Sequence, residues 1–413
     1  MTFTVKFDVL QGCLNLSVFL YVLSVFWVAS IPGYSRLVHV CVAFMLLCLF
    51  FAAWRRGIKL RLDPILLLFW IFMLFAYTSI SWSGERTTAT VSTVSLLVNI
   101  LGASLVWVAL WNKVPIRVVG YAAIVGASIQ SGVALQQFWA GGGEVFRSEG
   151  LTGNANALAV QLSIAAFLVL VSLRRAFWPP LMAFLFVLIA TLVSGSRKIA
   201  FVWFVFGLLV LQYIGVQFQS SRLFRIGFLL GLPLLVYGSL SYSDVLLKPV
   251  EGLYVYERIE ATIEGEESSA NTRDAMMREG LDLWRGSPLY GYGINQYRFL
   301  GSYATYSHNN YTELLVSFGI IGLVLYYSVL LILLFRAARG FQKGAPYASL
   351  LGSAVLLLLL WDVALVAYST RLIWLFLGVL AFLSEQPSAL GAASSVSSPS
   401  LSSSPSRPTR ALS

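Results

Sequence analysis

Long apolar runs separated by short polar intervals cover most of this chain. A helix that crosses a bilayer needs about 20 apolar residues, with a range of roughly 17–25. We identify twelve such runs, at approximately 9–30, 37–54, 63–82, 91–111, 117–139, 155–173, 180–194, 199–216, 226–242, 311–335, 345–368 and 370–384. The pattern predicts an all-α integral membrane protein with about 12 transmembrane helices. One long outward loop, at about 243–310 and with short helices of its own, separates the ninth helix from the tenth.

Composition supports this class of fold. Of the 413 residues, 58% are hydrophobic and only 11% are charged, whereas a soluble protein carries about 25% charged residues. So little charge cannot cover a water-soluble fold of this size, and the excess apolar surface must face lipid. We expect residues 1–385 to form a polytopic transmembrane domain and residues 386–413, which are rich in Ser and Pro, to be a disordered tail. The cysteines all lie in apolar runs, which offers neither a disulfide framework nor a zinc cluster: Cys13, Cys41 and Cys48.

Basic residues set the predicted orientation. When the amino terminus is placed in the cytoplasm, every inward loop is basic, as the positive-inside rule requires. Both termini are then cytoplasmic and the long loop is outward. The inward basic residues are Arg55, Arg56, Lys59, Arg61, Lys113, Arg117, Arg174, Arg175, Arg222, Arg225, Arg336, Arg339 and Lys343.

The long loop shows the signals of a helix near its middle. Asn271 can cap a helix that begins at Thr272. On that helix one face is mostly apolar, and Arg273 shares it, so we expect this arginine to point toward the membrane body. The opposite face carries Arg278, Asp282 and Arg285.

Polar segments that reach the outward face are candidates for a functional site, because the bilayer penalises polar groups without a role. A glycine-rich loop at 141–156 holds Arg147 and Glu149 and opens a helix that Asn154 or Asn156 can cap. A helix amino terminus beside an arginine attracts phosphate; the alternative is a plain capped loop.

Two adjacent cations, Arg197 and Lys198, lie at another outward hairpin, where the helix dipole adds positive potential. The alternative is a pair of side chains that snorkel to the membrane interface. Arg273 is the third candidate, although it can also be an ordinary surface arginine of a soluble helix.

The fourth candidate is His308, at the point where the long loop re-enters the membrane, followed by Asn309 and Asn310. An imidazole can exchange a proton near neutral pH. A structural histidine is the alternative. We expect the four segments to meet at one pocket just outside the bilayer.

These segments resemble, in the same order, the sequence blocks of the O-antigen ligase and polymerase superfamily. His308-Asn309, nine residues, Gly319, two residues and Gly322 resemble its His-Asn…Gly-x-x-Gly signature. The resemblance covers about residues 140–340, and it extends to Arg147…Gly153-Asn154-Ala155-Asn156, Ser194-Gly195-Ser196-Arg197-Lys198 and Arg273…Pro288-Leu289-Tyr290-Gly291-Tyr292-Gly293.

The resemblance implies a multi-span glycosyltransferase of the bacterial inner membrane that needs no metal and no cofactor. Its donor is an oligosaccharide on undecaprenyl diphosphate, used at the periplasmic face, and transfer inverts the anomeric centre. A polymerase passes the glycan to the next lipid-linked repeat unit, and a ligase passes it to lipid A–core in lipopolysaccharide biosynthesis. The amino-acid sequences of the 194–198 and 309–311 segments resemble polymerases slightly more than ligases, which favours an O-antigen or surface-polysaccharide polymerase. The partners are then lipids, glycans and a possible chain-length regulator, and not nucleic acid.

The chemistry of such a reaction assigns roles to the candidate residues. Negative charge grows on the diphosphate leaving group, and guanidinium groups bind phosphate oxygens bidentately while staying charged. We expect Arg197 and Arg273, then Arg147 and Lys198, to bind the diphosphate. His308 would be the general base, with Asn309 and Glu149 in contact with substrate. Glu149 and Glu313 are reserve candidates for the base, and Gly319 and Gly322 are expected to permit close helix packing.

Two other classes of protein compete with this interpretation. A flippase or transporter for a lipid-linked sugar would show internal repeats and charged residues within its spans. We find no repeat, and Asp362 is the one acidic residue well inside a span, where hydrogen bonding within the bundle explains it. A structural scaffold for polysaccharide assembly would not need the outward arginines or His308.

Overall fold

The computed structural model describes residues 8–27, 36–141, 148–172, 178–194, 268–343, 345 and 347–386. Every regular element in these ranges is helical, which confirms the predicted all-helical class for the described residues. The elements are α1 (Val9–Phe26), α2 (Arg36–Arg56), α3 (Pro64–Thr78) with the short helix η2 (Ser79–Trp82), α4 (Arg86–Trp111), α5 (Arg117–Ala140), α6 (Ala155–Ser172), α7 (Pro179–Ser194), α12 (Ser268–Gly286), α13 (Tyr297–Leu300), α14 (Asn310–Gln342), α15 (Ala348–Asp362) and α16 (Arg371–Ser384).

Helices of membrane-spanning length dominate the fold. Within the described ranges, seven are long and apolar enough to cross a bilayer, namely α1, α2, α3 with η2, α4, α5, α6 and α14, and shorter apolar helices lie at Leu181–Ala190, Ala348–Asp362 and Arg371–Ser384. The spans predicted at 199–216 and 226–242 lie outside the described residues, as does the tail from residue 387, so the total of twelve stays a prediction.

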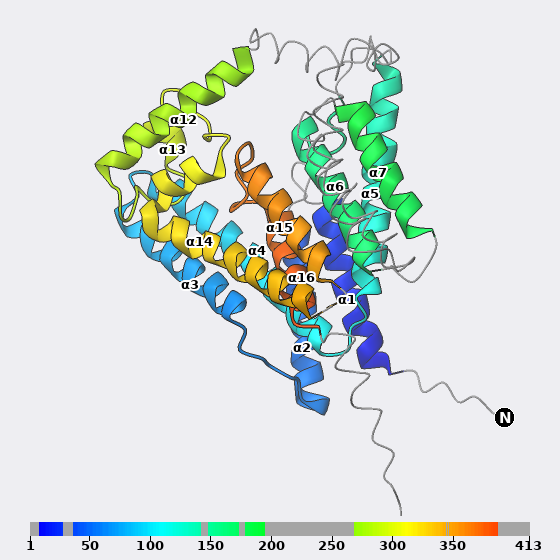
Figure 1. The fold of residues 1–413 in the computed structure, drawn as a ribbon. Helices are drawn as coiled ribbons and strands as arrows, with labels where there is room; N and C mark the ends of the chain where they lie inside the picture. Colours follow the sequence, from blue (N-terminus) through cyan, green and yellow to red (C-terminus); the bar gives the residue numbers. More distant parts are fainter. Residues whose placement is uncertain are drawn as a thin grey trace, which may run out of the picture.

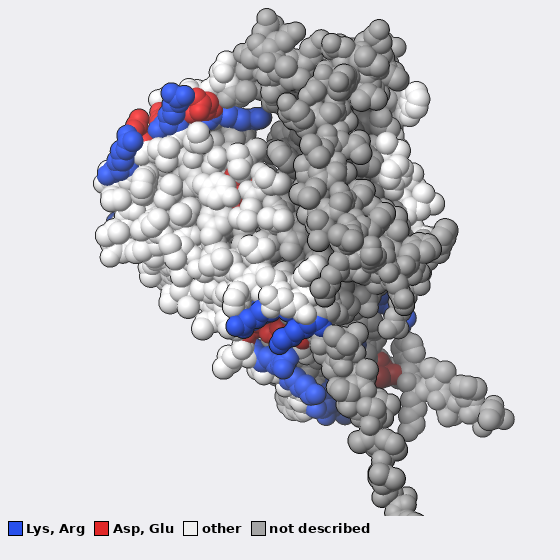
Figure 2. Space-filling view, in the orientation of Figure 1, with Lys and Arg blue, Asp and Glu red and all other residues white. Residues whose placement is uncertain are grey.

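Charge and apolar surface are separated on the face of the molecule that Figure 2 shows. Lys, Arg, Asp and Glu side chains gather over α12 at one end and around the ends of α14 and α16 at the other, with a zone between them that is almost entirely uncharged. Large apolar side chains of α14 and α3 are exposed, including Leu331 at 66% and Leu74 at 63%. Exposed apolar surface on this scale needs a lipid environment, and the protein is therefore a multi-pass membrane protein.

The helices form two neighbouring groups, as Figure 1 shows. In one group α3 and α15 pack on α14 while α16 packs on α4; in the other, α5, α6 and α7 pack together and α1 joins them to the rest. Trp374 on α16 is 1% exposed and contacts Phe69 and Phe72 of α3 and Tyr326 of α14. This aromatic cluster fills the space between α3, α14 and α16.

Local sequence signals explain where several helices begin. The Asp63 carboxylate accepts the Ile65 N–H (2.6 Å) immediately before Pro64 at the first position of α3. Asn154 Oδ1 accepts the N–H groups of Asn156 and Ala157, which confirms the predicted cap of α6. The prediction for α12 was wrong by one turn. Because residues 268–270 contain no glycine or proline to stop it, α12 begins at Ser268, and Asn271 lies inside it.

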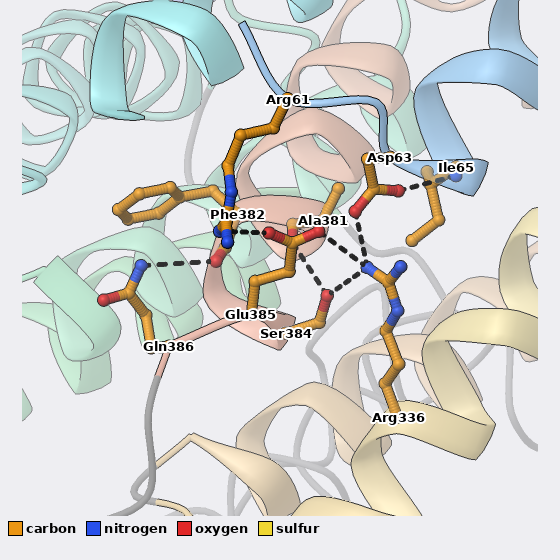
Figure 3. Close-up of polar contacts among 9 residues, drawn as sticks. All are labelled: Arg61, Asp63, Ile65, Arg336, Ala381, Phe382, Ser384, Glu385 and Gln386. Carbon is orange, nitrogen blue, oxygen red and sulfur yellow. Dashed lines mark hydrogen bonds and ion pairs between the residues drawn. The ribbon is translucent and has the colours of Figure 1, made fainter. Parts of the chain in front are cut away.

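One end of the bundle is tied together by ion pairs. Arg336 Nη1 lies 2.8 Å from Asp63 Oδ2 and 3.6 Å from Glu385 Oε1, and Arg61 Nη1 lies 3.0 Å from Glu385 Oε2 (Figure 3). We call Arg61, Asp63, Arg336 and Glu385 the ion-pair cluster. It joins the loop before α3 to the carboxyl ends of α14 and α16. Loops that the sequence predicts on one side of the membrane therefore meet at this end.

A buried polar group in the apolar interior also has protein partners. Asp362, at the end of α15, accepts hydrogen bonds from Tyr327 (2.8 Å) and Asn310 (3.1 Å) of α14. This confirms hydrogen bonding within the bundle as the explanation for Asp362.

Candidate functional site

The helix α12 lies across the start of α14 at the end of the molecule remote from the ion-pair cluster (Figure 1). Tyr297 donates a hydrogen bond to the Met276 carbonyl (2.7 Å), and Gly280 lies so close to Thr312 that a β-carbon there would clash. Arg273, which is half-buried, lies on the same face as Met276 and Gly280, three and seven residues before them. Arg278, Asp282 and Arg285 are exposed on the other face, so the predicted amphipathic pattern is confirmed.

The second residue before α14 is held in an uncommon backbone conformation. His308 has φ +57°, the left-handed region that residues other than glycine seldom adopt. Its two neighbours fix it there: the Ser307 N–H donates to Glu313 Oε2 (2.8 Å), and Asn309 caps α14 by accepting the Thr312 N–H (3.0 Å). Such conformations persist only where the surroundings over-determine them, and they cluster at functional sites.

The two asparagines after His308 connect α14 to the loop between α15 and α16. Asn309 Nδ2 donates to the Val363 carbonyl (3.0 Å). Asn310 Oδ1 accepts the N–H groups of Ala367 (2.9 Å) and Tyr368 (3.1 Å). These bonds give both amides a structural role, and the contact of Asn309 with substrate stays a prediction.

Tyr306 is the side chain around which the charged groups gather. Its ring centroid lies 4.2 Å from that of His308. Burial raises the pKa of the Tyr306 hydroxyl, the positive charges of Arg273 and Arg298 oppose this rise, and the negative charge of Glu313 adds to it. The charges of Arg273, Arg298 and Glu313 therefore lie near enough to act on the Tyr306 hydroxyl, and His308 lies against its ring.

A cavity of ≈ 320 Å³ opens beside Tyr306. Arg298 and Glu313 line it together with Asn295, and the first turns of α4 and the loop between α15 and α16 complete its walls. Pockets that hold small molecules measure about 300–1,000 Å³, so the cavity has the size for a compact ligand.

Sequence reasoning named Glu313 only as a reserve base and missed Arg298 and Tyr306. Arg298 lies in the one-turn helix α13, where no periodic pattern marks it. Tyr306 precedes His308 by two residues, a spacing that places its ring beside the imidazole only once the loop folds.

The two glycine-containing blocks of the loop and α14 bind each other through their backbones. Gly319 breaks α14 with φ +61°, and the segment 288–293 lies against the break. Tyr292 N–H donates to the Val316 carbonyl (2.8 Å), and Ile320 N–H donates to the Pro288 carbonyl (2.9 Å). A β-carbon at Gly319 would lie 2.3 Å from the Leu289 carbonyl. The prediction that Gly319 permits close helix packing was wrong: Gly319 permits a close approach, but its partner is this loop segment.

The remaining predicted residues are not part of this assembly as described. Glu149 is exposed in the loop between α5 and α6, and within the described ranges no hydrogen bond or ion pair links it to Arg273 or His308. Arg147, Arg197 and Lys198 lie outside the described residues. The structure thus brings together Arg273, His308 and Asn309. Among the described side chains, no group of three or more His, Cys, Asp or Glu is placed to hold a metal ion.

Comparison with known proteins bears on the same part of the chain. No curated protein matches the sequence. A family model described as O-antigen ligase matches residues 162–327, a range that contains α12, the cavity-lining Arg298, His308 and the Gly319 break. The resemblance to the O-antigen ligase and polymerase superfamily is therefore confirmed, and residues 162–327 form an O-antigen ligase family domain.

Proposed function

We propose that this protein is a glycosyltransferase that moves a glycan from undecaprenyl diphosphate to an acceptor hydroxyl at the periplasmic face of the inner membrane. The observation that carries the proposal is a cavity inside the O-antigen ligase family domain that is lined by Arg298, Glu313 and Tyr306, with His308 against the Tyr306 ring. The charge of Arg273 also acts on Tyr306.

We propose that His308 acts as the general base in the transfer step. The acceptor oxygen forms a bond to the anomeric carbon of the donor sugar while the bond from that carbon to the diphosphate oxygen breaks. The bonding electrons leave with the diphosphate, and the acceptor proton passes to the neutral His308 imidazole. A single displacement of this kind inverts the anomeric centre and involves neither a covalent glycosyl-enzyme nor a metal ion.

Arg273 is proposed to bind the diphosphate as its negative charge grows. The half-buried guanidinium stays charged and acts more strongly in a partly desolvated site than in water. Arg197 is its proposed partner, with Arg147 and Lys198 in support; all three lie outside the described residues. Glu149, exposed on its loop, is kept as a substrate-contact candidate.

The backbone around His308 supports its role as base. Because the Glu313 carboxylate holds the Ser307 N–H and Asn309 caps α14, the imidazole starts from a fixed position. A reacting group held in place saves the entropy of orienting it during the reaction.

Orientation follows from charge. The end that carries the ion-pair cluster also carries Arg55, Arg56 and Lys59, so we place it and both termini in the cytoplasm. The cavity end then faces the periplasm, where lipid-linked donor, acceptor and a chain-length regulator would meet it.

Polymerase is the activity we favour, because the sequences of the 194–198 and 309–311 segments resemble polymerases slightly more than ligases. Ligase is the second candidate, because the matching family model is described as O-antigen ligase. A deletion strain separates the two. Loss of long lipid-linked glycan indicates a polymerase, whereas long lipid-linked glycan that never reaches lipid A–core indicates a ligase.

The transfer chemistry is tested with His308→Gln and Arg273→Ala in purified protein supplied with the organism's own lipid-linked glycan. We expect His308→Gln to lower kcat by about 10²–10⁴-fold and Arg273→Ala to lower transfer by about 10²–10³-fold. Arg278→Ala, an exposed arginine on the same helix, serves as the control and should retain wild-type rates. Near-normal transfer by both test variants, at normal levels of folded protein, would remove the proposed chemistry.

A further inference from the structure

The Arg298 side chain carries a buried hydrogen-bond donor that has no acceptor in the described part of the chain. Its Nε is buried and makes no hydrogen bond. No ion pair or hydrogen bond to its guanidinium is formed by any side chain or carbonyl in the described part of the chain. A buried donor without an acceptor is destabilising, so natural proteins seldom keep one without a reason. The guanidinium lines the cavity, where a ligand oxygen can reach it.

Glu313 offers hydrogen-bond acceptors to the same cavity. The residue is 1% exposed and lines the same cavity, and its Oε2 accepts the Ser307 N–H. A carboxylate has about four lone-pair positions. The backbone bond to Ser307 therefore leaves acceptor capacity for a ligand hydroxyl.

The other polar lining consists of neutral hydroxyl and amide groups. Ser95, Asn295 and Thr370 contribute them from three different parts of the chain. Tyr306 contributes both a hydroxyl and an aromatic ring. With one guanidinium and one carboxylate, the charges of the lining cancel.

This set of groups discriminates between a diphosphate and a sugar. A diphosphate would place its negative charge beside the buried Glu313 carboxylate, which repels it. A neutral polyol has adjacent hydroxyls that can donate to Glu313 and accept from Arg298, and its ring can lie against Tyr306. The cavity therefore fits a sugar ring better than a phosphate.

The position of His308 indicates whether the sugar in the cavity belongs to the donor or to the acceptor. Tyr306 lines the cavity, and its ring centroid lies 4.2 Å from that of His308, so the imidazole lies close to the cavity wall. A hydroxyl of a sugar in the cavity can thus be presented to the base, and the sugar that loses a proton is the acceptor. We infer that the cavity lined by Arg298, Glu313 and Tyr306 binds the terminal sugar ring of the acceptor, with Arg298 and Glu313 as binding residues. This inference rests on the proposed transfer function.

The test uses two probes on the detergent-purified full-length protein. One is free undecaprenyl diphosphate, which reports diphosphate binding. The other is a lipid-free oligosaccharide, either the repeat unit released from the organism's own polysaccharide or the core oligosaccharide, measured as an inhibitor of transfer. The variants are Arg298→Met and Glu313→Gln, since glutamine keeps an oxygen that can accept the Ser307 N–H.

We expect both variants to raise the inhibition constant of one oligosaccharide by about tenfold or more, because a site built to bond hydroxyls loses affinity when one partner is removed. Binding of undecaprenyl diphosphate should stay within about twofold of wild type. The reason is that the charge removed by each variant, at position 298 or 313, does not act on the diphosphate. Arg278→Met, an exposed arginine paired with Asp274, is the control and should change neither quantity.

Three results would overturn the inference. Weaker binding of undecaprenyl diphosphate by Arg298→Met would mean that the cavity holds the diphosphate. Unchanged inhibition constants for both oligosaccharides would mean that the cavity binds no acceptor sugar. If Arg298→Met does not fold, Arg298→Lys is measured in its place. Because lysine keeps the positive charge, this variant should bind the oligosaccharide better than Glu313→Gln does. Failure to do so would also contradict the inference. Failure of the proposed function is distinct, because the wild-type protein would then transfer no glycan.

Discussion

The charged side chains at the two ends of α14 differ in their partners: those at one end form ion pairs with each other, and those at the other end face a cavity. At the carboxyl end, Arg336 lies within 3.0 Å of Asp63 and of the Ser384 hydroxyl, and Glu385 bridges it to Arg61 (Figure 3). At the amino end, Glu313 and Arg298 line the same cavity without forming an ion pair with each other. A buried charge with internal partners holds helices together, and removing one partner is costly. A charge left facing a cavity is instead available to a ligand.

Replacement of Asp63 should have the largest effect on stability. Its side chain is fully buried, pairs with Arg336 and caps α3. Asp63→Ala should destabilise the protein by roughly 3–5 kcal/mol, because it leaves the Arg336 charge buried without this partner. Asp63→Asn should cost less, because asparagine keeps the cap. Thermal unfolding in detergent measures both variants.

Asp274, which is exposed and paired with Arg278, provides the control for that experiment. Asp274→Asn should change stability by about 0–1 kcal/mol, as expected for a surface ion pair. Equal losses from Asp63→Ala and Asp274→Asn would show that the cluster does not hold the helices together.

The break in α14 should give the next largest effect. Gly319→Ala places a β-carbon 2.3 Å from the Leu289 carbonyl at a residue with φ +61°. We expect a loss of about 1–3 kcal/mol from backbone strain and a reduced rate of transfer, because the 288–293 segment must move. Measurements of unfolding temperature and initial rate test this, and a stable, fully active variant would contradict it.

Gly352→Ala is the matched control for the break. It lies in a regular helix, α15, and a β-carbon there meets only Ala337 at 3.7 Å. Because alanine is the better helix former, this change should be neutral or stabilising by up to about 1 kcal/mol.

A smaller effect should appear in the pH dependence of the ion-pair cluster. Burial and the neighbouring Asp63 carboxylate raise the pKa of Glu385 to about 7, against the attraction of Arg336 and Arg61. A raised pKa means that the folded state binds a proton more tightly than the unfolded state, in which a glutamate has a pKa of about 4.3. The corresponding stability is fully present below the unfolded value and is lost as the pH rises through about 7.

Glu385→Gln tests that sign. The wild-type protein should lose stability relative to this variant between about pH 4.5 and pH 7, and unfolding temperatures measured at several pH values would show it. Parallel curves for the two proteins would mean that the pKa of Glu385 is not raised.

The smallest expected effect on stability is at the cavity. Arg298→Met should leave the unfolding temperature unchanged or slightly raise it, because it removes a buried donor that has no acceptor. A large loss of stability, comparable with that of Asp63→Ala, would show that Arg298 serves the fold, and the contrast between the two ends of α14 would disappear.

Much of the fold follows from the sequence because lipid imposes one simple rule on spanning helices. The apolar runs at 155–173 and 370–384 correspond closely to α6 and α16. The prediction was poorer where a helix begins with polar residues outside the apolar run. The structure begins α4 at Arg86, about one turn before the predicted 91, because Arg86, Thr87 and Thr90 are exposed and polar and do not belong to an apolar pattern.

The candidate site was predictable only in part. The His308 and Arg273 blocks are marked by their motifs, and the structure brings them to one tyrosine. The cavity depends on contacts between distant segments, such as the bond from the Glu85 N–H to Gln296 Oε1 (2.8 Å), which span more than two hundred residues. No local pattern in a sequence records such a contact, and so Arg298 was missed.

We propose above that the cavity end and the ion-pair end of the protein lie on opposite sides of the membrane, with the cavity outside. Single cysteines at the exposed Ser302 and Lys343 positions, in a protein whose Cys13, Cys41 and Cys48 are replaced, can be treated with a membrane-impermeant maleimide in intact spheroplasts. We expect labelling of Ser302→Cys in intact spheroplasts and of Lys343→Cys only after lysis. Labelling of Lys343→Cys alone, or of both positions before lysis, would contradict it.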